Sequence, residues 1–106
     1  MDEREVAAQV RRSAFHNIYG KEAVEAFCGG SAEVIEAGES VAALYVEGKF
    51  ARVYWSIQDE KAIPSLLEQV RKRAGAQPFV SEIIYRENRR PPAIERFIQA
   101  GMRQHC

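Results

Sequence analysis

The sequence predicts an α/β (α+β) domain built on a mixed, mostly antiparallel sheet with helices on both faces. Three observations predict this class: two amphipathic helical patterns, one β-hairpin, and a final strand-and-helix pair. Along the chain, the predicted elements follow the order α-α-β-β-β-α-β-α. A β-α-β connection after a three-stranded meander adds a parallel strand to antiparallel ones and leaves helices to cover both faces.

The N-terminal region is predicted to form two helices. In residues 3–19, apolar side chains recur at helical spacing on a stripe that runs from Val6 to Ile18, and Gly20 ends the pattern. Residues 21–28 have the same character over a shorter length. Both helices are therefore expected to bury one face against the sheet.

The middle of the chain reads as three strands, at residues 32–36, 41–46 and 50–57. The Glu47-Gly48-Lys49 turn predicts a hairpin between the last two strands. Bulky side chains alternate on both faces of 50–57, which is typical of a central strand that is covered on both sides.

The C-terminal half reads as a helix, a strand and a second helix. In the helix at 61–74, Pro64 must lie in the first turn, because a proline in the interior costs about 3 kcal/mol. An apolar, β-rich strand is predicted at 79–85. The last helix, at 92–101, begins after Pro91 and ends at Gly101.

Composition limits the classes of function. The 106 residues suit one domain with one small core, and fifteen acidic residues balance fifteen basic ones. A neutral chain has no general attraction to nucleic acid or to an anionic membrane. No apolar run approaches the roughly 20 residues of a membrane span, and the charged start lacks the apolar centre of a signal peptide. We therefore expect a cytoplasmic protein.

Cysteine and histidine patterns give no metal site. Cys28 and Cys106 match no metal-ligand spacing, and free thiols in a reducing cytosol are expected, although one disulfide stays open as an alternative. His16 and His105 are the only histidines, and they are far apart in the sequence.

The stretch from residue 50 to 102 resembles the GNAT superfamily of acyl-CoA-dependent N-acetyltransferases. The last motif of that family reads roughly N-x-x-A-I-x-x-Y-x-x-x-G-F, and this chain has Asn88, Ala93-Ile94, Phe97 and Gly101-Met102. Glu82 resembles the acidic residue common in the preceding strand of the family. The resemblance implies a single GNAT-like domain over residues 1–106 that lacks the family's first strand and last two strands.

The resemblance also implies transfer of an acetyl group from acetyl-CoA to a small amine acceptor. Glu82 is the candidate base for that amine. Phe97 stands where many members carry a tyrosine, and it has no hydroxyl proton to donate. The positions that the resemblance assigns to acetyl-CoA are two residues at the end of the long strand, two in the following loop and two in the later turn: Ser56, Ile57, Gln58, Lys61, Asn88 and Arg89.

Several departures from the family pattern favour a second hypothesis. The loop at 57–64 has no glycine, whereas the family binds the CoA diphosphate on a glycine-rich loop. Asp59 and Glu60 would repel a diphosphate there, and Pro91-Pro92 lengthens the later turn. The alternative is a non-catalytic GNAT-fold domain for protein interaction or dimerisation, in which a homodimer or a protein partner completes the open sheet.

A basic turn gives a third and weaker hypothesis. Arg86, Arg89 and Arg90 surround Asn88 after the predicted last strand. They suit either a solvated turn or an anion site for a CoA phosphate or nucleic acid, and we favour the solvated turn over nucleic-acid binding.

Overall fold

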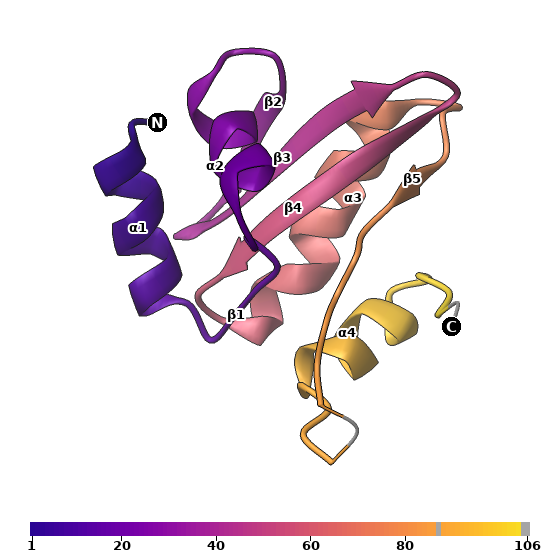
Figure 1. The fold of residues 1–106 in the computed structure, drawn as a ribbon. Helices are drawn as coiled ribbons and strands as arrows, with labels where there is room; N and C mark the ends of the chain where they lie inside the picture. Colours follow the sequence, from indigo (N-terminus) through magenta and orange to yellow (C-terminus); the bar gives the residue numbers. More distant parts are fainter. Residues whose placement is uncertain (87, 105–106) are drawn as a thin grey trace.

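A computed structural model describes residues 1–86 and 88–104, which form four α-helices and a five-stranded sheet (Figure 1). The helices are α1 (Glu3–Arg12), α2 (Lys21–Cys28), α3 (Ile63–Ala74) and α4 (Ala93–Gln99). The strands are β1 (Phe15–His16), β2 (Glu33–Ala37), β3 (Ser40–Glu47), β4 (Phe50–Ile57) and β5 (Phe79–Val80). The predicted α+β class and the mostly antiparallel sheet are confirmed.

Strand β4 is the central strand of the sheet. The order is β1-β4-β3-β2, and β5 also pairs with β4. β1 lies antiparallel to the end of β4, with Phe15 opposite Ile57, whereas β5 lies parallel to its beginning, with Phe79 opposite Ala51. Two short strands therefore share one edge of β4. The β3–β4 hairpin has the predicted position.

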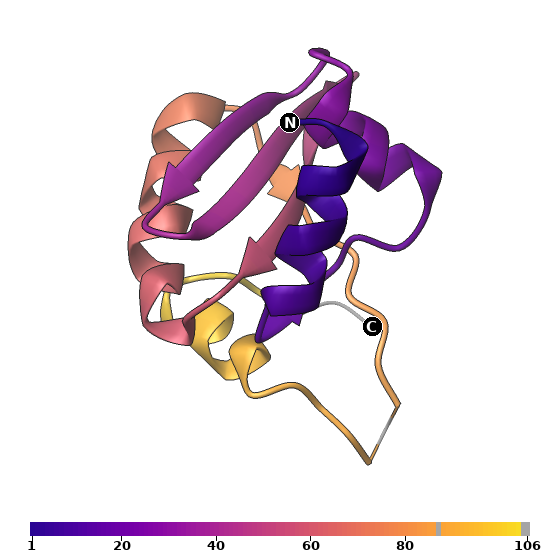
Figure 2. The same cartoon turned by 90° about the vertical axis from the view of Figure 1, so that its left-hand side faces the viewer.

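The sheet separates two apolar cores, and Figure 2 shows α1 and α2 on one side of it and α3 and α4 on the other. On the α3 and α4 side, Trp55 and Leu66 are fully buried and Phe97 nearly so. On the α1 and α2 side, Val6 and Phe27 are buried. Successive side chains of β4 point alternately into the two cores, which confirms that 50–57 is covered on both faces.

Helix α1 is shorter than predicted. It begins with a capping box in which Asp2 and Glu5 bond each other's backbone, and it ends where the Ser13 backbone turns extended. Ser13 Oγ donates to the carbonyl of Val10 (2.7 Å). The prediction of one helix over 3–19 is therefore wrong beyond Arg12, and the element order gains a strand, β1, between the first two helices.

Helix α3 begins as predicted, with Pro64 in its first turn after a short 3₁₀ turn at Glu60–Ala62. Its end at Gly75 has a φ of 63°, which favours glycine. The predicted strand at 79–85 is wrong as a ladder, because only Phe79–Val80 pair with β4. The last helix is α4, slightly shorter than the predicted 92–101.

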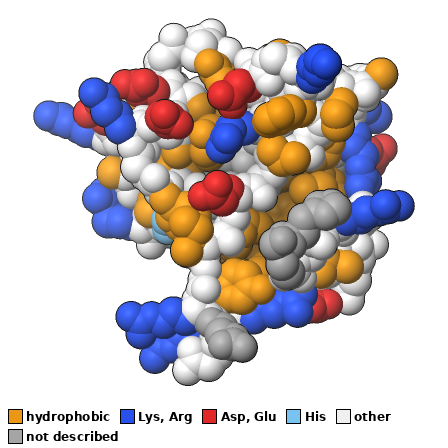
Figure 3. Space-filling view, turned by 45° about the vertical axis from the view of Figure 1, so that its right-hand side comes forward, with side chains coloured by type: hydrophobic (Ala, Val, Ile, Leu, Met, Phe, Trp, Pro, Cys, Tyr) orange, Lys and Arg blue, Asp and Glu red, His pale blue; other side chains and the backbone are white. Residues whose placement is uncertain are grey.

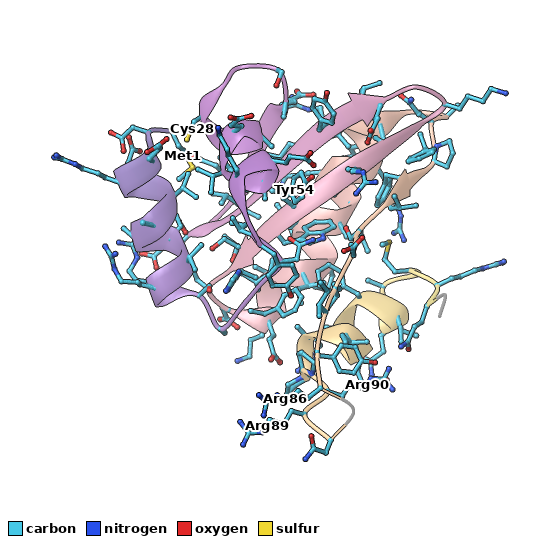
Figure 4. The ribbon with its side chains drawn as sticks, in the orientation of Figure 1. Met1, Cys28, Tyr54, Arg86, Arg89 and Arg90 are labelled. Atoms are coloured by element: carbon cyan, nitrogen blue, oxygen red, sulfur yellow. The ribbon has the colours of Figure 1, made fainter. Side chains whose placement is uncertain are left out.

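Within residues 1–86 and 88–104, no helix has both the length and the apolar character needed to cross a bilayer. In the same residues, no group of His, Cys, Asp and Glu side chains is arranged to hold a metal ion. Cys28 is a free, half-buried thiol at the end of α2, next to Met1 (Figure 4). Cys106 and His105, which the sequence analysis considered, lie outside the described residues.

Candidate functional site

The end of β4, which holds the predicted CoA contacts Ser56 and Ile57, is hydrogen-bonded to the N-terminal segment. The amide of Ala14 donates to the carbonyl of Ile57 (2.8 Å), and Ser56 lies opposite His16 in the β1–β4 pairing. The Ser56 hydroxyl donates to the carbonyl of Gln9 (3.3 Å). Both residues are fully buried. The strand end is therefore an internal part of the sheet rather than an open edge.

Asn17 joins three parts of the chain at this junction. Its Nδ2 donates to the carbonyls of Val53 and Glu82 (3.2 Å each), and its Oδ1 accepts from the amide of Trp55 (2.6 Å). The side chain is 2% exposed. It thus fills the space between β4 and the segment that follows β5. Tyr19 extends this link, because its hydroxyl donates to the carbonyl of Ile84 (3.3 Å).

The loop after β4 is also held by its own side chains. The amide of Gln58 donates to Ser40 Oγ (2.9 Å), and Gln58 Nε2 donates to Gln9 Oε1 (2.9 Å). The Asp59 carboxylate accepts the amide of Lys61 (2.9 Å) and so caps the 3₁₀ turn. One loop amide is therefore already bonded to a carboxylate, and the Lys61 side chain is exposed.

Phe97 belongs to an aromatic cluster under the sheet. Its ring centroid lies 4.9 Å from that of Trp55 and 5.9 Å from that of Phe15, with the rings tilted against each other. Such edge-on pairs add to the burial energy. Phe97 is 4% exposed, so the position has a packing role.

Beside this cluster lies an apolar pocket of about 280 Å³. Trp55 and Phe97 form its floor, and Ile83 and Met102 are among its walls. Its buried polar atoms are satisfied internally, since Trp55 Nε1 donates to Ser81 Oγ (2.7 Å), which donates to the carbonyl of Val53 (3.0 Å).

Glu82 lies on the opposite face from Phe97. It lines a hollow of about 160 Å³ with Arg52, Tyr54 and Glu22 of α2, on the α2 side of the sheet. Burial raises the pKa of Tyr54, and the hydrogen bond and charge of Glu47 raise the pKa of Arg52. The structure therefore does not bring the two predicted catalytic positions, Glu82 and Phe97, together.

The arginine turn lies on the loop before α4 (Figure 4). Arg90 pairs with Glu95 (2.6 Å), whereas Arg86, Asn88 and Arg89 are exposed. The amide of Arg89 donates to the carbonyl of Arg86 (2.8 Å), which forms a turn.

The segment 81–86 is extended and runs from β5, beside the sheet, to the loop before α4 (Figure 1). Ser81, Ile83 and Tyr85 line the pocket on the α4 side, whereas Glu82 and Ile84 line hollows on the α2 side. This alternation is that of a strand. The carbonyls of Glu82 and Ile84 point inward, to Asn17 and Tyr19.

The outer side of this segment is open in the part of the chain that the structure describes. There, no hydrogen bond involves the backbone groups of Ser81, Ile83 or Tyr85. Since backbone groups of alternate residues point to the same side of a strand, these three face outward. Sequence reasoning predicted an open sheet but did not locate the open edge at 81–86, and it missed the role of Asn17.

The chain was compared with protein-family models, curated proteins and solved structures, and no match was found in any of the three searches.

Proposed function

We propose that this chain is a non-catalytic GNAT-like domain that binds another protein by adding a strand of that protein to the open edge at 81–86. The observation that carries the proposal is the row of outward backbone groups at Ser81, Ile83 and Tyr85. An unpaired strand edge is a template for a partner strand, because main-chain hydrogen bonds supply the affinity.

Exposed apolar side chains on the α2 side of the edge support the same proposal. Ile84 is 65% exposed, Tyr19 beside it is 44% exposed, and Val80 at the start of the segment is 47% exposed. A partner strand that pairs with the edge would cover part of this surface, and that burial is favourable. Figure 3 brings the right-hand side of the Figure 1 view forward and shows apolar side chains there, with Asp and Glu side chains among them and Lys and Arg side chains at the lower end.

The competing hypothesis is acyl transfer from acetyl-CoA to a small amine. The resemblance places acetyl-CoA against Ser56 and Ile57, yet both are fully buried and Ile57 already accepts the amide of Ala14. Acyl transfer also needs a base and an acid at one site, yet Glu82 and Phe97 lie on opposite faces. These observations favour the non-catalytic hypothesis.

A peptide selection tests the proposal. Random eight-residue peptides are displayed and selected against the chain, which is immobilised sparsely enough that two copies cannot pair with each other. Selected peptides are expected to bind at least tenfold more weakly to Ile84→Lys, because a lysine on an edge opposes strand addition. The matched control is Val46→Lys, which replaces another exposed apolar residue, 58% exposed, on the β3–β4 hairpin. This control should leave binding unchanged.

Two results would contradict the proposal. One is a selection that yields no peptide, or only peptides that Ile84→Lys does not weaken. The other is thermal stabilisation of the chain by several degrees with millimolar acetyl-CoA and CoA but not with ATP, which saturating ligand produces. That second result would favour the transferase hypothesis.

A further inference from the structure

The edge at 81–86 has a charge pattern that is complementary to itself. Glu82 and Arg86 carry opposite charges two residues before and two residues after Ile84. All three side chains are exposed, whereas the alternate residues Ser81, Ile83 and Tyr85 are half-buried. The exposed row is therefore acidic at one end, apolar in the middle and basic at the other end.

An antiparallel pairing of this segment with itself brings these groups together. If a two-fold axis passes through Ile84, then Glu82 of each copy lies opposite Arg86 of the other, and Ile84 lies opposite Ile84. Opposite charges and apolar groups facing each other across strands are both favourable. A closed two-fold arrangement also leaves no further edge for aggregation at this side.

The backbone hydrogen-bonding groups of this segment point in the directions that this register requires. In an antiparallel pair, residues alternate between positions that exchange hydrogen bonds and positions that do not. Ile84 and Glu82 direct their carbonyls inward, to Tyr19 and Asn17, so they suit positions without interchain bonds. The backbone N–H and C=O groups of Ile83 and Tyr85 face outward. This register places Ile83 of one copy opposite Tyr85 of the other, where the two residues can exchange hydrogen bonds.

The arginines at and after the end of this segment lie on the outside of the loop, and Figure 4 shows Arg86 and Arg89 pointing away from the body of the molecule. On the α2 side, the exposed Tyr19, whose hydroxyl donates to the carbonyl of Ile84, adds to the apolar surface at this residue.

From these observations we infer that the partner strand comes from a second copy of this chain, paired antiparallel through 82–86 about a two-fold axis at Ile84. The inference rests on the proposed function, since it names the partner of the same edge. The dimer pairs the two 82–86 segments at the edges of the two sheets.

Charge exchange tests the register. Glu82→Arg places two arginines opposite each other at both ends of the pairing, and Arg86→Glu places two glutamates there. Sedimentation velocity should show wild type with twice the 12.0 kDa mass of one chain. Each single variant should dissociate with a Kd about tenfold or more higher, because like charges directly opposite are destabilising. All of these side chains are exposed, so the fold should be unaffected.

Mixing Glu82→Arg with Arg86→Glu is the decisive experiment. One copy then carries two arginines and the other two glutamates, so both cross-strand pairs are attractive again. We expect an equimolar mixture to form a heterodimer with close to wild-type affinity, and the double variant Glu82→Arg/Arg86→Glu to form a homodimer. Dimerisation that survives in the single variants, or variants that stay apart when mixed, would overturn the register.

A wild-type chain that stays monomeric at 100 µM or so would overturn the second copy as partner. The proposed function would survive that result if selected peptides still bind in an Ile84-dependent way. It would fail separately if the chain dimerises through another surface and the peptide selection yields nothing.

Discussion

At the scale of single residues, Asn17 has the largest structural role of the buried polar side chains. It is 2% exposed and bonds to Val53, Trp55 and Glu82, which belong to two different segments of the sheet. Without Asn17 the buried amide of Trp55 would have no partner, whereas the carbonyl of Val53 would keep its bond from Ser81 Oγ. A buried, unsatisfied polar group costs about 1–3 kcal/mol.

Replacing Asn17 is therefore expected to destabilise the fold strongly. Asn17→Ala should lower the free energy of unfolding by roughly 2–4 kcal/mol, because the Trp55 amide and the Glu82 carbonyl lose their partner and a small cavity opens. Chemical denaturation measures the change. The exposed Asn88→Ala is the matched control and should stay within about 0.5 kcal/mol of wild type. Equal stability of the two variants would contradict this account of the junction.

His16 makes the stability of the same junction depend on pH. Its Nδ1 accepts the amide of Ile18 (3.1 Å), a bond that only the unprotonated nitrogen can make, and burial lowers the pKa of the imidazole. In the unfolded chain a histidine titrates near pH 6.5, whereas the folded chain resists protonation until a lower pH. The stabilisation of the folded state by neutral His16 is thus complete above about pH 6.5, and it is lost as the pH falls through the folded-state pKa.

We expect the free energy of unfolding to fall as the pH drops from about 7 to 5, partly because of His16. His16→Asn keeps an acceptor oxygen near the position of Nδ1 but does not titrate, so its stability should depend less steeply on pH. Denaturation at several pH values compares the two slopes. Parallel pH profiles for wild type and His16→Asn would show that His16 does not contribute.

At the scale of elements, local patterns predicted some elements well and others poorly. The β3–β4 hairpin, the two-sided burial of β4 and the position of Pro64 in the first turn of α3 follow from turn chemistry, alternation and proline geometry. Each depends on residues close together in the sequence, which is why sequence reasoning could identify them.

The errors arose where two cores compete for one stretch of chain. Phe15 and Ile18 fit a single helical stripe, but in the structure Phe15 enters the α3 and α4 core and Ile18 enters the α1 and α2 core. An extended chain sends residues three apart to opposite faces, and no local signal distinguishes the two options. Likewise, Asn17 occupies the β4-facing side of the 81–85 segment, so the predicted strand there pairs only at its first two residues.

Of the candidate site, too, one part could be predicted from the sequence and another part could not. The aromatic packing of Phe97 and the burial of Ser56 and Ile57 depend on long-range contacts with residues 9–16. Only the fold could reveal that the N-terminal segment is bonded to the end of β4. The Glu82, Ile84 and Arg86 pattern, in contrast, was readable from the sequence once the strand was known to be an edge.

At the scale of the whole molecule, the sheet has its helices on both faces and a long open side at 81–86. The strands β2 and β3 lie on the other side of β4, so the two edges are far apart in the strand order. The β2 edge exposes Glu33 and Glu36, charges that discourage edge pairing. The 81–86 edge presents Ile84 at its centre instead, so it is the side suited to a partner.

Disulfide trapping at the two-fold axis tests the central claim most directly. In a background with Cys28→Ser and Cys106→Ser, Ile84→Cys should form a covalent dimer under mild oxidation. Residues that face each other without interchain bonds have Cα atoms about 4.5 Å apart, within disulfide range. Val80→Cys is the control, because the two copies of residue 80 would lie roughly 27 Å apart along the paired strands.

The account predicts rapid, nearly complete cross-linking of Ile84→Cys and little of Val80→Cys, although both positions are exposed. Equal cross-linking of the two variants, or none of Ile84→Cys at concentrations where the chain is dimeric, would contradict the pairing about Ile84.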